Sequence, residues 1–120
     1  YMKRDFDLIR TILLAIEEQH DGTAIYGFSI PDHALSEVGY HCMLLYEHGF
    51  ISDYKSQYGD NQILSVVVGG LTWEGCDYLE KVRDNSRWAK IKNIISNKCL
   101  PLTVEVVKEV VTEMVKTALV

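Results

Sequence analysis

SEVGYHCMLLYEHGFISDYKSQYGDNQILSVVVGGLTWEG, at residues 36–75, contains the elements around which the rest of this chain is predicted to be organised. Its first part predicts a helix, because Val38, Cys42 and Leu45 recur at helical spacing and form one apolar stripe. This helix is expected to end at Gly49, since glycine readily takes the left-handed conformation that follows many helices. The stripe is expected to face the core, which leaves the opposite side of the helix for recognition.

A β-hairpin is predicted directly after this helix. Residues 50–55 and 62–68 are rich in aromatic and β-branched residues and are expected to pair as strands. The loop between them contains Gly-Asp-Asn at residues 59–61, and these residue types tolerate the positive φ of a tight turn. Thr72 is then expected to cap a further helix. A helix, a hairpin and a second helix predict an α+β fold of the winged-helix type, with a two-stranded wing.

The remaining elements are predicted from polar N-caps, apolar helical periodicity and β-branched runs. They are a helix at residues 5–20 with Asp5 as N-cap, a strand at 24–30, a helix capped by Ser86 that ends near residue 97, and a helix at 103–119 capped by Thr103. Only about one helical turn fits between residues 32 and 36, so the helix before the recognition helix is expected to be abbreviated or fused to it. Together these elements predict a single winged-helix domain over residues 2–120, with extra C-terminal helices.

The composition is that of a globular protein and opposes binding to polyanions. Hydrophobic residues make up 48% of the chain and charged residues 24%, which are ordinary proportions. No apolar run approaches the ~20 residues that span a bilayer, so no membrane association is expected. The net charge of −5 disfavours contact with phosphate backbones, so nucleic-acid binding would need a local basic patch.

No catalytic, cofactor or metal site is predicted. Cys42, Cys76 and Cys99 lack C-x-x-C spacing and are expected to be free and buried, in a reducing cytoplasm. No G-x-S-x-G motif occurs, and no nucleophile has an obvious adjacent base. Gly69 and Gly70 are not followed by the Lys-Ser/Thr ending of a phosphate-binding loop. We therefore expect no enzymatic activity.

Four segments resemble an uncharacterised bacterial protein family that is often prophage-encoded and is similar in pattern to the YjcQ winged-helix proteins. They are MKRDFDLIRTILLAIEE at residues 2–18, YHCMLLYEHGFI at 40–51, LTWEGCDYLEKVRDNSRWAKIK at 71–92 and PLTVEVVKEV at 101–110. The L-T-x-x-G-x-x-Y-L and W-x-K patterns within the third segment are the most specific. The resemblance implies a small winged-helix protein of phage or mobile-element origin and transfers no functional residues.

The recognition helix has an unusual predicted outer face. It carries Tyr40, Met43 and Tyr46, whereas DNA-reading helices usually present Arg, Lys, Asn or Gln to the bases. Three interpretations stay open at this point. The C-terminal helix covers Met43, or the face binds a protein partner, or the tyrosines contact phosphates of DNA.

A DNA complex would need the cationic side chains to contact phosphates. The expected contacts are Lys3, Arg4, Lys55, Arg87 and Lys90. Residues 86–99 contain four Lys or Arg and no acid, which predicts either part of this patch or simply a solvated basic face. The leading expectation is a non-enzymatic, DNA-binding transcriptional regulator. The alternative is a protein-interaction module on the same scaffold.

The last predicted helix carries two apolar lines. Val104, Val107, Val111, Met114 and Ala118 follow a heptad spacing, and Val106, Val110, Val115 and Leu119 form a second line beside it. One line can pack on the body of the protein, and the second predicts a partner. We therefore expect a homodimer through residues 103–119, with Val107, Val111 and Met114 at the contact.

Overall fold

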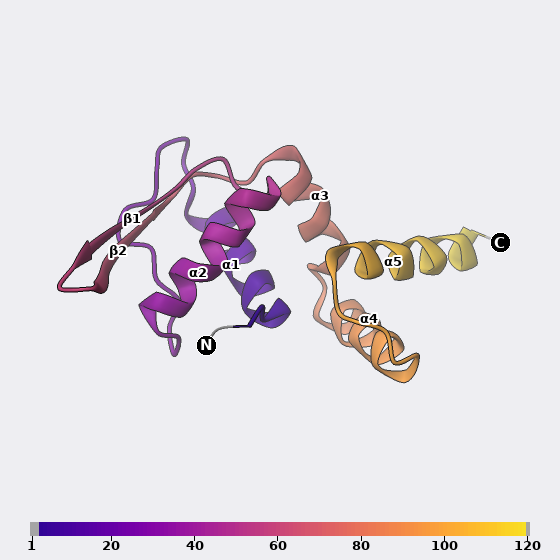
Figure 1. The fold of residues 1–120 in the computed structure, drawn as a ribbon. Coiled ribbons are helices and arrows are strands. Elements are labelled where there is room, and N and C mark those ends of the chain that lie inside the picture. The colour runs from indigo at the N-terminus through magenta and orange to yellow at the C-terminus, as the bar shows by residue number, and fades with distance from the viewer. Residues whose placement is uncertain (1–2, 120) are drawn as a thin grey trace. The chain divides into compact units, whose positions relative to one another are not determined.

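A computed structural model describes residues 3–119, which form an α+β fold with five helices and a two-stranded antiparallel hairpin (Figure 1). The chain divides into two compact units, Tyr1–Leu79 and Glu80–Val120, and the boundary lies within helix α3, Trp73–Val82. No helix among the described residues is long and apolar enough to cross a membrane.

The first unit is built on helices α1, Phe6–Gln19, and α2, Leu35–His48. The predicted N-cap of α1 is confirmed, because the Asp5 carboxylate accepts hydrogen bonds from two backbone N–H groups of the first turn. The predicted end of α2 is also confirmed, since Gly49 has a φ of +87°. The two helices pack against each other. Between them, residues 31–33 form a turn, and no helix precedes α2 directly.

The hairpin consists of β1, Tyr54–Gly59, and β2, Gln62–Val68, in antiparallel register. Both strands pack against α2 (Figure 1). The prediction for β2 is confirmed. The prediction of a strand at 50–55 is wrong, because β1 begins and ends four residues later, at Tyr54 and Gly59. Asp60 and Asn61 have φ values of +51° and +62°, the signature of a two-residue hairpin turn, so the pairing extends up to Gly59.

The predicted strand at residues 24–30 does not form, and only an isolated bridge is present. Ile25 and Val68 exchange two backbone hydrogen bonds of 2.8 and 3.1 Å, and the Phe28 N–H donates to the Val66 carbonyl at 2.9 Å. Gly27 has a φ of +63°, which turns the chain after one bridge and prevents a regular strand. Ile51, which was expected in β1, makes a similar isolated bridge to Leu71.

The first turn of α3 is fastened to the end of α2 by Thr72. Its hydroxyl donates to the Gly49 carbonyl and accepts from the Gly75 N–H at 3.1 Å, and its own N–H donates to the Phe50 carbonyl at 3.0 Å. The predicted cap is therefore confirmed, and it also makes a tertiary contact. Gly75 allows this close approach, because a Cβ there would lie 3.0 Å from the carbonyl carbon of Phe50 and nearer still to its oxygen.

Tyr78 stacks on Phe50 with ring centroids 5.1 Å apart, and its hydroxyl is buried. Among the described residues this hydroxyl has no hydrogen-bond partner, and burial raises its pKa. We expect Tyr78→Phe to raise the free energy of unfolding by about 1 kcal/mol, because the ring stays and the unsatisfied hydroxyl is removed. Urea denaturation measures this difference, with the exposed Tyr26→Phe as control. A loss of stability in Tyr78→Phe would contradict the burial of an unpaired hydroxyl.

The second unit contains helices α4, Asn85–Asn97, and α5, Val104–Leu119, which pack against each other. Asp84, and not the predicted Ser86, caps α4, since its carboxylate accepts from the Arg87 N–H at 2.8 Å. The predicted cap of α5 is confirmed, because the Thr103 hydroxyl accepts from the Val106 N–H at 3.2 Å.

Candidate recognition surface

Helix α2 separates the core of the first unit from its outer surface. Val38, Cys42 and Leu45 are buried, as the sequence predicts. Tyr40 and Met43 are half-buried, and Tyr46 is exposed. Tyr40, Met43 and Tyr46 therefore lie outside the buried stripe, as predicted, and Tyr46 is the most exposed of the three.

His41 lies on the inner side of α2 and is only 1% exposed. Its Nε2 accepts a hydrogen bond from the Asp5 N–H at 2.9 Å, and its Nδ1 donates to the Glu37 carbonyl at 2.8 Å. Because one partner can only donate and the other can only accept, the imidazole is neutral with its proton on Nδ1. His41 thus joins the start of α1 to the middle of α2.

A groove of about 520 Å³ runs between α2 and the hairpin, and we call it the α2–hairpin groove. It is lined by Leu35, Ser36, Tyr40 and Met43 from α2, Tyr54 and Tyr58 from β1, and Asn61, Gln62 and Ile63 from the turn and β2. Gly39 lets the hairpin come this close, because a Cβ at that position would lie 2.7 Å from Cδ1 of Ile63. Two of the predicted contact residues, Tyr40 and Met43, are therefore brought together with two tyrosines of the hairpin, Tyr54 and Tyr58.

None of the side chains that line this groove carries a charge at neutral pH. Burial raises the pKa of Tyr54, so its hydroxyl stays protonated. The groove offers hydroxyl and amide groups that donate and accept hydrogen bonds, together with aromatic and aliphatic surface. Such a lining can pair with a polypeptide backbone and cover apolar side chains, but it holds no fixed cation for a phosphate.

The unit that contains this groove is acidic as a whole. The first unit carries four Lys or Arg residues against twelve Asp or Glu residues, a net charge of −8, whereas the second unit carries eight against five, a net charge of +3. Among the four cations, Lys3 and Arg4 precede α1 and are exposed, and Lys55 is exposed on β1. Arg4 lies over the ring of Phe6, 5.7 Å from its centroid.

The other predicted contact residues belong to the second unit. Arg87 and Lys90 are exposed on α4 and line a groove between α4 and α5. Of the predicted dimer contacts, Val107 and Val111 are buried within the chain, and Met114 is half-buried at the same groove. The buried pair belongs to the apolar line that packs internally, so the accessible apolar surface of α5 lies on the second line.

The cysteines divide into two environments. Cys42 is buried, and burial raises the pKa of its thiol to about 12, so it stays protonated and unreactive. The prediction that all three cysteines are buried is wrong, because Cys76 and Cys99 are exposed. Both lie on the solvent side of a helix or at its end, positions that apolar periodicity alone does not resolve. Within residues 3–119, no three His, Cys, Asp or Glu side chains are grouped as a metal site.

Two parts of this surface were not predicted from the sequence. Tyr54 and Tyr58 lie four residues apart in β1, a spacing that places them on one face of a strand. That signal was present, but the strand was expected to end at residue 55. The role of His41 had no comparable signal, because both of its partners are backbone groups, the Asp5 N–H and the Glu37 carbonyl.

Comparisons with known proteins identify relatives of this chain. The family model described as "Hypothetical protein (DUF2513)" matches residues 3–101. An "Uncharacterized protein" of Haemophilus influenzae is 35% identical over 124 residues, an alignment that covers 98% of this chain and 99% of that protein. No solved structure matches the chain.

Proposed function

The chain belongs to the DUF2513 family, and from the geometry of its first unit we propose a function for it. The first unit is a winged-helix module that binds a protein segment in the α2–hairpin groove. The order of α1, the Ile25 bridge to β2, α2 and the hairpin supports the winged-helix assignment. The resemblance to the YjcQ proteins and to prophage-encoded proteins also supports the winged-helix assignment.

The uncharged, tyrosine-rich lining of the α2–hairpin groove carries this proposal. A helix that reads DNA needs side chains that pair with base edges, and a wing needs cations near the phosphates. Here the α2 side of the groove presents Tyr40 and Met43, and the hairpin side adds Tyr54 and Tyr58. Tyrosine and methionine are enriched at protein interfaces, because they combine a large apolar area with a polar or adaptable tip.

The net charge of the first unit indicates the chemistry of the partner. A unit with a net charge of −8 attracts a basic surface and repels a polyanion. The groove itself is neutral, so the contacts inside it depend on shape and hydrogen bonds, whereas the charges around it steer the approach. We therefore expect a basic, extended protein segment with apolar anchors.

A peptide-selection experiment on the full chain tests this proposal. Random peptides displayed on phage are selected against the protein, and the affinity of the selected peptide is measured by fluorescence anisotropy. We expect Tyr40→Ala and Tyr58→Ala each to raise its Kd by about tenfold or more, since both rings line the groove. Tyr26→Ala is the matched control, because Tyr26 is an exposed tyrosine outside the groove and its loss should leave the Kd unchanged.

The same preparation is titrated with a random-sequence DNA duplex at low salt. We expect no saturable binding. Binding that weakens steeply with salt and is reduced by Arg4→Ala and Lys55→Ala would instead identify a DNA-binding regulator of phage or mobile-element origin. That result, or selected peptides that ignore both Tyr40→Ala and Tyr58→Ala, would contradict the proposal.

A further inference from the structure

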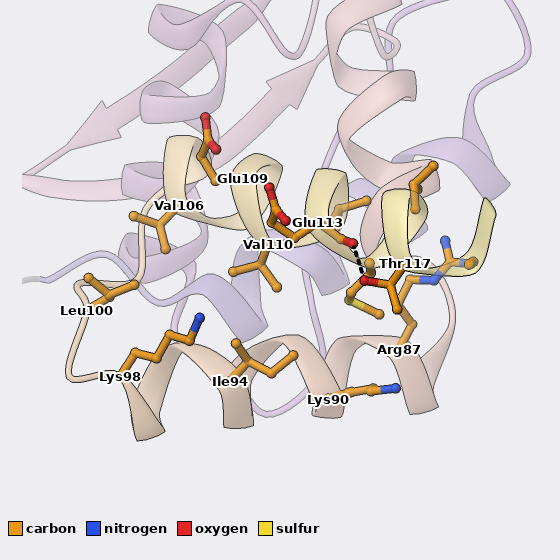
Figure 2. A pocket seen from close by; sticks show the side chains of 14 residues that line it. Arg87, Lys90, Ile94, Lys98, Leu100, Val106, Glu109, Val110, Glu113 and Thr117 are labelled. Atoms are coloured by element: carbon orange, nitrogen blue, oxygen red, sulfur yellow. Dashed lines mark hydrogen bonds between the residues drawn. The ribbon is translucent and has the colours of Figure 1, made fainter. Parts of the chain in front are cut away.

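A second groove, of about 790 Å³, lies between α4 and α5 of the second unit, and we call it the α4–α5 groove (Figure 2). The two helices run antiparallel across it. Figure 2 shows Arg87 toward the end formed by Thr117, and Lys98 toward the end formed by Val106. The groove is formed by residues of the second unit alone, so the α2–hairpin groove and the proposed function do not enter into it.

The interior of the α4–α5 groove is apolar and accessible. Ile94 of α4 and Val110 of α5 point into it and are half-buried (Figure 2). Val115, which also lines it, is 50% exposed, and Leu100 at its end is 45% exposed. A row of accessible aliphatic side chains between two helices is typical of a surface on which further helices pack.

The two sides of this groove carry opposite charges. Arg87, Lys90 and Lys98 stand along α4, and Glu109 and Glu113 stand along α5 (Figure 2). Among the described residues, the three cations form no ion pair, while Glu113 has an exposed contact of 3.6 Å with Lys116. A surface with one basic edge and one acidic edge is complementary to a second copy of itself, because a twofold axis can place each edge over its opposite.

We propose that a second copy of this chain occupies the α4–α5 groove and that the two helix pairs form an antiparallel four-helix bundle. The charges select one of two arrangements. A twofold axis across the helices would stack α4 on α4 and oppose cation to cation. An axis along the helices places α4 over α5 of the partner subunit, which brings Lys90 over Glu113 of the partner subunit and closes the aliphatic row from both sides.

Sedimentation equilibrium on the full chain tests the existence of the dimer. We expect a dimer at micromolar concentration. Val115→Asp should raise the dimer Kd by about tenfold or more, because it places a charge in the closed row. Leu64→Asp is the matched control, since Leu64 is a 61% exposed aliphatic residue on β2, and it should leave the dimer Kd unchanged. A wild-type chain that stays monomeric at about 100 μM would overturn the proposal.

A mixing experiment tests the arrangement of the two copies. Lys90→Glu alone opposes two acids at each contact, and Glu113→Lys alone opposes two cations, so we expect each variant to raise the dimer Kd by about tenfold or more. An equimolar mixture of the two variants should recover the wild-type Kd, because both contacts of the mixed dimer again pair opposite charges. Pairing within one chain would give no recovery on mixing, and that result would overturn the crossed arrangement. Circular dichroism verifies that each variant is folded.

Discussion

Replacing Gly75 by alanine is expected to lower the free energy of unfolding by about 3 kcal/mol or more. Intrinsic helix propensity alone predicts the opposite sign, since alanine is favoured over glycine by about 1 kcal/mol within a helix. The contact with Phe50 decides between the two effects. A methyl group at Gly75 would meet the backbone carbonyl of Phe50, with the carbonyl carbon 3.0 Å away, and this backbone is held by its own hydrogen bond to Thr72. The first turn of α3 would therefore have to move away from α2.

Gly39→Ala is the matched control for this substitution. Gly39 also lies inside a helix, but the atom nearest to its added Cβ is Cδ1 of Ile63, at 2.7 Å, the far end of a flexible side chain. We expect a change of less than about 1 kcal/mol, because Ile63 can shift and the gain in helix propensity offsets the cost. Thermal or urea unfolding measures both variants. Equal destabilisation by Gly75→Ala and Gly39→Ala would show that the Phe50 carbonyl is not the obstacle.

Replacing His41 by alanine is expected to lower the free energy of unfolding by about 3 kcal/mol. The substitution leaves a cavity in the core of the first unit, removes the acceptor of the Asp5 N–H and removes the side-chain donor to the Glu37 carbonyl. Amide hydrogen exchange gives the most direct readout. The Asp5 amide should lose its protection in the variant, because its acceptor is gone.

Two further variants separate packing from hydrogen bonding at this site. His41→Phe keeps a ring of similar size but offers no polar atom, so we expect it to lower the free energy of unfolding by about 2 kcal/mol. His33→Ala removes an accessible histidine that pairs with Glu37 at 2.5 Å, and it should cost less than about 0.5 kcal/mol. Full stability in His41→Phe would mean that ring packing alone explains the burial of His41.

The helix ends of this protein could be predicted from the sequence because they depend on local chemistry. Asp5 and Thr103 cap their helices through hydrogen bonds that span only a few residues. Gly49 ends α2 through its own backbone conformation. Ser86 was the exception, since Asp84 lies two residues earlier and its carboxylate reaches the same first turn.

The candidate grooves could be predicted only in part. The sequence placed Tyr40 and Met43 on the outer face of α2, because helical spacing determines which residues share a face. It did not predict Tyr54 and Tyr58 opposite them, because the two-residue turn at Asp60 and Asn61 moves the strand toward the tip of the hairpin. The α4–α5 groove required the pairing of two helices, which leaves Val110 and Val115 accessible while it buries Val107.

The order of the helices, the second strand of the hairpin and the inward stripe of α2 could therefore be predicted without coordinates, since these features follow from residue spacing along one segment. The contacts between segments could be found only in the folded structure: His41 with Asp5, Gly75 with Phe50, and the hairpin with α2. The physical reason is that such contacts depend on the packing of residues tens of positions apart. Periodicity within a segment predicts a face, whereas the neighbour of that face is set by the free energy of the whole fold.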